Sequence, residues 1–303
     1  MIKYGLRRII ISLIFLFLIS FSFVFYVSYS VVKRFIFRRI HKEAWLAQTQ
    51  KFNEQLRLQH GAQPISFQSK DGIHLAGLLF TRPQAQRNLL LCHGYSRSKE
   101  RLFNLIHLFP DDNILIFDYR GHGESQGDYT TIGFYEKNDV LAAFNYLKTA
   151  EQTKELPIFG IGVSMGAVSL LAAAAEHNEF KGIVVDSVFK QLDEQVAKMF
   201  PEKTGLPLVP FINVCNSIFN YICNCRMSDV NSISCAQRLK TPIFIIHSNH
   251  DSMADVAAAH ALYNAISGPK KLWIVDNAIH ARIYKKYPED YIKHVSEFFN
   301  AIS

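Results

Sequence analysis

A short apolar run that passes into a serine flanked by glycines, and then into an alanine-rich stretch, constrains this chain more than any other feature. Residues 158–162 suit a strand buried on both faces, and residues 167–175 are rich in Ala and Leu, which favour helix. Gly162-Val163-Ser164-Met165-Gly166 lies between them. A turn this tight holds its central residue in a strained conformation and needs small neighbours two positions away. The pattern therefore predicts a strand–turn–helix unit with the Ser164 hydroxyl at the start of the helix.

Strand-length apolar runs and helical patterns alternate along the rest of the chain. An Asp71-Gly72 turn predicts a hairpin between the first two runs. The expected strands are Ile65–Ser69, Ile73–Phe80, Asn88–Cys92, Ile114–Asp118, Ile158–Gly162, Ile183–Asp186, Ile243–His247 and Lys271–Val275. The expected helices cover residues 99–109, 132–150, 165–177, 254–266 and 288–301. This order predicts an α/β fold, with a mostly parallel sheet of about eight strands and helices on both faces.

One connection, residues 187–240, is far longer than the others. Pro201, Pro207 and Pro210 divide it, and Val214–Ile222 is an apolar patch with aromatic residues. Long connections in compact domains are often active-site lids, so we predict a helical lid insertion over the strand ends. A purely structural helical insertion is the alternative.

The N-terminus carries an uncharged segment, Ile9–Val32, whose 24 residues are long enough to cross a bilayer as a helix. A cleaved signal peptide is the alternative, but its apolar region is usually only about 7–15 residues long. We therefore predict a single-pass membrane anchor at 1–42 with a span at 9–32. A polar connector at 43–62 and one globular domain at 63–303 follow it.

The net charge of +7 comes from the flanks of this span. Eight basic residues and no acidic one precede Glu43, which leaves 25 basic against 26 acidic residues in the remainder. A nearly neutral body argues against nucleic-acid binding, whereas basic flanks suit anionic lipid headgroups. The flanking basic residues are Lys3, Arg7, Arg8, Lys33, Arg34, Arg38, Arg39 and Lys42. Their distribution only slightly favours a cytoplasmic body, so the side of the membrane stays open, as does the oligomeric state.

Two later strand-end loops offer the partners that a nucleophilic serine needs, a base and a group that orients it. Asp251 follows the strand at 243–247, and His280 follows the strand at 271–275. We predict Ser164 as nucleophile, His280 as base and Asp251 as the orienting acid, with Asp186 as the alternative acid. A dinucleotide-binding loop is the rival reading of the glycines, but it would need glycine where Met165 stands.

Attack on a carbonyl also requires two backbone N–H donors for the oxyanion. We predict that Met165, the residue after the serine, supplies one. The loop after the strand at 88–92 reads His93-Gly94-Tyr95, and Tyr95 is expected to supply the other. His93 is expected to brace this loop.

These motifs together resemble the α/β-hydrolase superfamily. They are His93-Gly94-Tyr95, Asp118-Tyr119-Arg120-Gly121-His122-Gly123-Glu124-Ser125, Gly162-x-Ser164-x-Gly166, Asp251 and His280. The chain is most similar to membrane-anchored hydrolases of the monoacylglycerol-lipase and acyl-thioesterase-like group, over residues 63–300. The resemblance implies hydrolysis of small acyl esters, thioesters or lipids through an acyl-enzyme, with no metal or organic cofactor. It also implies structural roles for Arg120 and His122. Ser248 and Ser252-Met253-Ala254 depart from the usual pattern, which bears on loop shape.

Two other functions remain open at this point. One is a serine peptidase of the prolyl or aminopeptidase type, which the same triad would serve. The other is a non-catalytic hydrolase relative that binds lipid or protein. The five cysteines, Cys92, Cys215, Cys223, Cys225 and Cys235, are expected to be free thiols, with a disulfide within 215–235 as the alternative.

Overall fold

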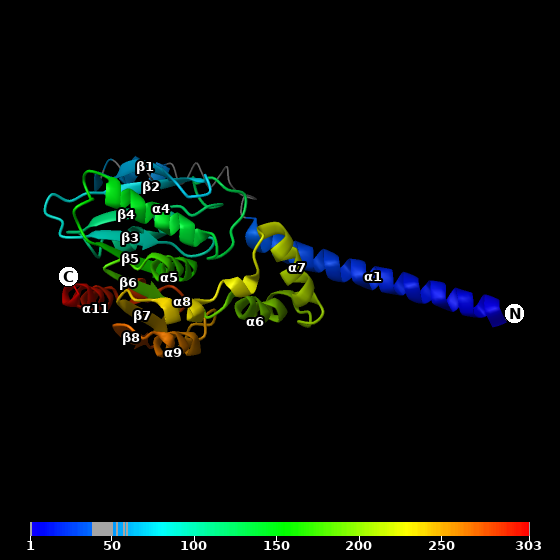
Figure 1. Ribbon diagram of the computed structural model, residues 1–303. Helices are drawn as coiled ribbons and strands as arrows, with labels where there is room; N and C mark the ends of the chain where they lie inside the picture. Colours follow the sequence, from blue (N-terminus) through cyan, green and yellow to red (C-terminus); the bar gives the residue numbers. More distant parts are fainter. Residues whose placement is uncertain (1, 38–50, 53, 57, 59, 303) are drawn as a thin grey trace.

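The computed structural model describes residues 2–37, 51–52, 54–56, 58 and 60–302. Its centre is an eight-stranded sheet in the order β1-β2-β4-β3-β5-β6-β7-β8 (Figure 1). The strands are β1 (Gln63–Gln68), β2 (His74–Phe80), β3 (Asn88–Cys92), β4 (Asn113–Phe117), β5 (Ile158–Val163), β6 (Gly182–Asp186), β7 (Ile243–Ser248) and β8 (Lys270–Val275). β2 pairs antiparallel with β1 and β4, and all other pairs are parallel. The predicted fold class is confirmed.

Helices cover both faces of the sheet, because successive strand residues point to opposite sides. In β3, Leu90 and Cys92 join one apolar core, whereas Leu89 and Leu91 join the other. The first face carries α4 (Glu136–Thr149), α5 (Met165–His177), α8 (Ser232–Arg238) and α9 (Val256–Ala265). The second carries the 3-10 helix η2 (Lys99–Leu102) with α3 (Phe103–Ile106), α10 (Ile283–Lys286) and α11 (Pro288–Ala301).

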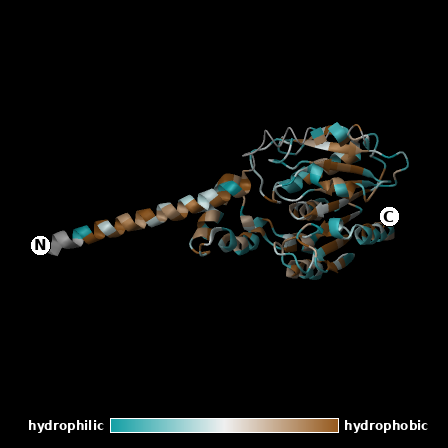
Figure 2. Cartoon of the chain, turned by 180° about the vertical axis from the view of Figure 1, so that it is seen from behind, coloured by the Kyte–Doolittle hydropathy of each residue, from teal (hydrophilic) through white to brown (hydrophobic). Residues whose placement is uncertain are grey.

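The N-terminal helix α1 (Ile2–Ile36) projects from the body as a long apolar rod (Figures 1 and 2). By length and composition it is able to cross a membrane, as either a membrane anchor or a signal sequence would be. Its last turns differ from the rest, because Ser28, Val32 and Ile36 are fully or almost fully buried. Their spacing of four places them on one helix face. The helix therefore continues from the candidate span into the domain. Arg38, Arg39, Lys42 and most of the predicted connector at 43–62 lie outside the described residues.

The insertion between β6 and β7 folds into α6 (Leu192–Thr204), α7 (Phe211–Cys223), the 3-10 helix η3 (Met227–Asp229) and α8. α7 runs beside the end of α1 (Figure 1), where Ser28 Oγ donates to the Phe211 carbonyl at 3.3 Å. The Phe23 and Phe211 rings meet edge to face, 6.1 Å apart. The insertion is thus helical as expected, but one of its helices packs on the N-terminal helix.

Candidate active site

Ser164 lies between β5 and α5 with φ 56° and ψ −118°, a strained backbone conformation for a residue with a side chain. A Cβ on Gly162 would come within 2.5 Å of the Gly166 carbonyl oxygen. A Cβ on Gly166 would come within 2.2 Å of the Cys92 carbonyl oxygen. Backbone atoms cannot yield as a flexible side chain can, so both positions require glycine. The serine hydroxyl is held at the helix N-terminus by this steric constraint.

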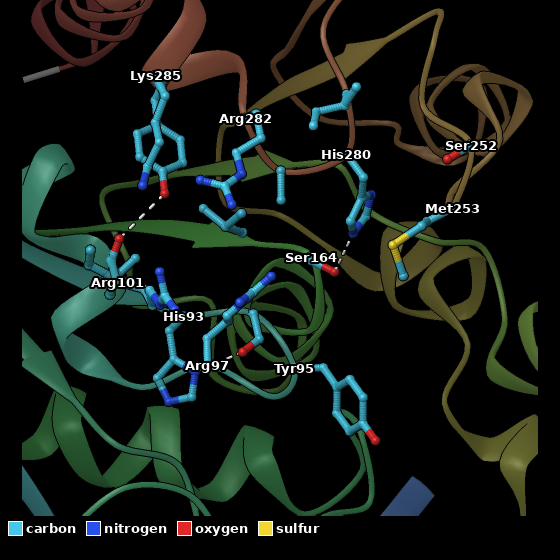
Figure 3. A pocket seen from close by; sticks show the side chains of 16 residues that line it. His93, Tyr95, Arg97, Arg101, Ser164, Ser252, Met253, His280, Arg282 and Lys285 are labelled. Carbon is cyan, nitrogen blue, oxygen red and sulfur yellow. Dashed lines mark hydrogen bonds between the residues drawn. The ribbon is translucent and has the colours of Figure 1, made fainter. Parts of the chain in front are cut away.

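Ser164, His280 and Asp251 form one chain of hydrogen bonds, although they come from three separate loops. Ser164 Oγ and His280 Nε2 are 2.8 Å apart, and His280 Nδ1 lies 2.7 Å from Asp251 Oδ2. Figure 3 shows the serine hydroxyl and the imidazole next to each other at the cavity, joined by this hydrogen bond. The structure thus brings together the three side chains that were predicted as nucleophile, base and acid.

The Asp251 carboxylate is held on both oxygens. Its Oδ1 accepts from the backbone N–H groups of Met253 and Ala254, each at 2.9 Å, which leaves Oδ2 for His280. Burial alone would raise the pKa of Asp251, but the His280 hydrogen bond and charge outweigh it and lower the pKa. The carboxylate is therefore ionised at neutral pH, and the proton of the shared hydrogen bond stays on His280 Nδ1.

Two neighbours of the acid were not predicted from the sequence. Buried His247 places its Nε2 3.7 Å from Asp251 Oδ2 and 3.0 Å from the Ala254 carbonyl oxygen. Ser248 Oγ accepts from the N–H groups of His250 and Ala278, at 3.2 Å each, and so joins the loops after β7 and β8. The only sequence signal was the departure from the family pattern at Ser248.

Met165 and Tyr95, the expected oxyanion donors, both lie close to Ser164. Met165 is the first residue of α5, a position whose N–H has no acceptor within the helix. Gly94 packs so close that an added Cβ would lie 3.4 Å from Ser164 Cβ. Tyr95 lines the same cavity, but its hydroxyl donates to the Phe35 carbonyl at 2.6 Å, at the end of α1. Its side chain therefore points away from Ser164 (Figure 3), and the loop is tied to the N-terminal helix.

Polar side chains brace the loops around the site. His93 is buried, which lowers its pKa to about 3 and keeps the ring neutral. Its Nδ1 lies 2.8 Å from the Gly94 carbonyl oxygen, and its Nε2 accepts from Tyr119 N–H at 3.2 Å. Arg120 donates to both Asp139 and Asp71. These bonds agree with the bracing and structural roles expected for His93 and Arg120.

A buried ion pair fixes the loop after β4. Lys99 Nζ donates to Asp118 Oδ2 and to Glu124 Oε2, at 2.6 Å each, and both Lys99 and Asp118 are almost fully buried. Gly123, with φ 51°, closes this turn, because an added Cβ would lie 2.0 Å from the Asp118 carboxylate.

Lys99→Met is expected to lower the free energy of unfolding by about 3–5 kcal/mol, because it leaves the Asp118 carboxylate buried without its counter-ion. Urea unfolding of the detergent-solubilised chain measures the change. Lys190→Met breaks the exposed Lys190–Glu194 pair and is the matched control, with an expected cost below about 1 kcal/mol. Equal effects of the two substitutions would contradict a structural role for the buried pair.

A cavity of about 400 Å³ opens beside Ser164 and His280 (Figure 3). It is lined by the loops after β3, β7 and β8, and no described residue of 187–240 lines it. The insertion only reaches its edge, where Gln195 Nε2 donates to the carbonyl of Met253 at 2.5 Å. In the structure the described part of the insertion does not line this cavity, and α7 packs against α1. The lid role of the insertion stays a prediction.

Three further expectations concern the alternative acid, the cysteines and metal binding. Asp186 is fully buried, and its Oδ1 accepts from Ser187 Oγ at 2.8 Å, so Asp251 and not Asp186 bonds His280. Burial raises the Asp186 pKa to about 7. All five cysteines are free, so the alternative of a disulfide is not what the structure contains. Within the described part of the chain, no cluster of three His, Cys, Asp or Glu side chains is arranged to bind a metal ion.

Comparisons with known proteins agree with this architecture. The family model described as serine aminopeptidase, S33, matches residues 83–220. The uncharacterized protein YqkD of Bacillus subtilis is 31% identical over 234 residues, covering 76% of each chain. The monoglyceride lipase of Rattus norvegicus is 23% identical over 236 residues, covering 66% of this chain and 77% of the lipase. The esterase Pf2001 of Pyrococcus furiosus superposes with a TM-score of 0.69 at 25% identity, covering 82% of this chain and 94% of the esterase.

These relatives and the shared fold support hydrolase activity. The chain belongs to the α/β-hydrolase superfamily, and its residues 83–220 match the family model described as serine aminopeptidase, S33.

Proposed function

We propose that the protein is a serine hydrolase that cleaves carboxylic esters or thioesters of acyl substrates through an acyl-enzyme. The observation that carries this proposal is the continuous set of hydrogen bonds from Ser164 through His280 to Asp251. A serine hydroxyl is a poor nucleophile until a base removes its proton. Because the Asp251 carboxylate holds the proton on His280 Nδ1, Nε2 is left as the acceptor for the serine proton.

In the first half of the proposed reaction, Ser164 Oγ attacks the acyl carbon while its proton moves to His280 Nε2. The oxyanion is stabilised by the N–H groups of Tyr95 and Met165. Collapse breaks the bond to the alcohol or thiol, which leaves with the proton from His280. In the second half, a water molecule loses a proton to His280 and attacks the acyl-enzyme. Ser164 then recovers its proton, and the acid is released.

An ester or thioester is favoured over a peptide by the charges around the serine. An aminopeptidase must bind a free ammonium group, which calls for a carboxylate near the nucleophile. Among the described residues that line the cavity there is no Asp or Glu, whereas Arg97, Arg101, Arg282 and Lys285 are present. The monoglyceride lipase and the esterase among the relatives agree with this choice. Peptide hydrolysis remains the second candidate because of the family description.

A substrate panel tests the choice of bond. We expect kcat/KM for short acyl esters and acyl thioesters to exceed that for aminoacyl and prolyl peptides by at least about a hundredfold, because the cationic cavity repels a free amine. The comparison uses the purified full chain and the same leaving group in each pair. A preference for aminoacyl substrates would transfer the proposal to the peptidase.

We also propose that α1 is a retained membrane anchor, since Ser28, Val32 and Ile36 are buried against the domain. The full-length chain is expected to stay in the membrane pellet after alkaline carbonate extraction, because about 20 apolar residues suffice to span a bilayer. Mass spectrometry of the extracted protein measures its N-terminus. A shortened chain lacking α1, found in the soluble fraction, would show a cleaved signal instead.

A further inference from the structure

Four cationic side chains surround the cavity beside the candidate nucleophile. Arg97 and Arg101 lie on the segment after β3, whereas Arg282 and Lys285 lie after β8. Figure 3 shows the two pairs on opposite sides of the space next to Ser164 and His280. The two pairs come from segments that are far apart in the sequence, so they do not form one continuous basic segment of the chain. The fold brings them together at one cavity.

The cluster has no acidic counterpart at the cavity. None of the side chains of Arg101, Arg282 and Lys285 forms an ion pair with another described residue, and no described Asp or Glu lines the cavity. The pKa of Lys285 is lowered, mainly because its ammonium group is partly buried and secondly because Arg282, Arg101 and Arg97 are positively charged. No ion pair with a described residue thus offsets the mutual repulsion between Arg101, Arg282 and Lys285.

The general charge of the molecule does not account for this concentration of cations. Residues 43–303 carry 25 basic and 26 acidic side chains, so a random patch of this surface would be close to neutral. Two buried basic side chains elsewhere have acidic partners, since Lys99 pairs with Asp118 and Arg120 pairs with Asp139. Like charges gathered at one cavity raise the free energy of the empty site, and a bound anion lowers that cost.

We propose that Arg101, Arg282 and Lys285 form an anion subsite, so that the preferred substrates are acyl esters or thioesters carrying a phosphate or a carboxylate. This inference rests on the proposed function and names its substrate class. Guanidinium groups bind phosphate and carboxylate through paired N–H donors, and the Lys285 ammonium adds a third positive charge. About 400 Å³ is enough for a small anionic group next to the reacting carbonyl.

Two pairs of substrates test the proposal and distinguish the source of the anion. Lauroylglycerophosphate against monolauroylglycerol places a phosphate on the leaving-group side. The mono-p-nitrophenyl ester of glutarate against p-nitrophenyl valerate places a carboxylate on the acyl side. In at least one pair we expect the anionic ester to have a kcat/KM about tenfold or more above that of the neutral ester. Raising NaCl to about 1 M should reduce this preference, because the screening length falls to about 3 Å.

Variants that remove single positive charges test which side chains cause the preference for anionic substrates. Arg101→Gln, Arg282→Gln and Lys285→Gln are each expected to lower the anionic-to-neutral ratio of kcat/KM by about three- to tenfold, the loss of one charged hydrogen bond at a partly exposed site. Lys293→Gln on α11 removes an exposed lysine that does not line the cavity, and it should leave the ratio unchanged.

The subsite proposal would be overturned if neither pair of substrates showed a preference for the anionic ester. It would also be overturned if the three cavity variants and the Lys293→Gln control had the same anionic-to-neutral ratio of kcat/KM. Fluorophosphonate labelling of Ser164 separates the two proposals. If labelling persists while the preference is absent, only the anion subsite fails. If the wild type is neither labelled nor able to cleave any ester, the proposed hydrolase function itself fails.

Discussion

Ser164→Ala is expected to lower kcat for ester cleavage by about 10⁴–10⁶-fold and to abolish labelling by a fluorophosphonate probe, because it removes the one described hydroxyl that is hydrogen-bonded to His280 Nε2. The fold should survive, since among the described residues Ser164 Oγ hydrogen-bonds only to His280. Initial rates with an activated ester, and gel fluorescence of the labelled chain, measure the two effects.

Ser252→Ala is the matched control for this substitution. Ser252 lines the same cavity, but among the described residues its side chain makes no hydrogen bond to His280 or Asp251, so its replacement should leave labelling intact. Equal labelling of wild type and Ser164→Ala would refute Ser164 as the nucleophile. Equal loss of labelling in both variants would show that the probe reports on the shape of the cavity and not on one hydroxyl.

Asp251→Asn is expected to lower kcat by about 10⁴-fold with little change in folding. Asp251 Oδ1 is held by the N–H groups of Met253 and Ala254, so the amide oxygen of Asn should stay there. The amide NH₂ group then faces His280 Nδ1, which must become an acceptor. His280 Nε2 then carries the ring proton and can no longer take the proton of Ser164. Single-turnover kinetics with an activated ester measure the loss.

Asp255→Asn provides the control on the same loop. Asp255 caps α9 by accepting from the Ala257 N–H, and Asn caps a helix equally well, so activity should be retained. Asp251→Asn activity within about tenfold of wild type would move the orienting role to another carboxylate. Asp186 is then the candidate, because its charge acts on His280 from the neighbouring strand end.

The tie between Tyr95 and α1 links the anchor to the proposed oxyanion site. Tyr95 OH bonds the Phe35 carbonyl, and the two rings lie 5.3 Å apart. Thr130 N–H donates to the Ile36 carbonyl at 3.0 Å. The end of α1 is thus part of the domain core and supports the loop whose backbone N–H is proposed to bind the oxyanion.

The sequence alone predicted the features that depend on near neighbours in the chain. The turn at Ser164 is encoded locally, because Gly162 and Gly166 are the residues that avoid backbone collisions there. Apolar run length placed every strand within two residues of its observed ends, since burial on both faces of a sheet leaves few alternatives. The early start predicted for α4 was wrong by four residues. There the Glu136 carboxylate accepts from Thr131 and Gly133 N–H groups and holds 130–135 outside the helix.

Only the tertiary structure decided which distant residues meet. The distances between Ser164, His280 and Asp251 depend on the pairing of β5, β6, β7 and β8, to which the whole core contributes. The packing of α7 on α1, and the gathering of Arg101, Arg282 and Lys285 at one cavity, have no local signal at all. Local sterics act between adjacent residues and can be read from their order, whereas contacts across the fold depend on the sum of many weak packing interactions that no single segment encodes.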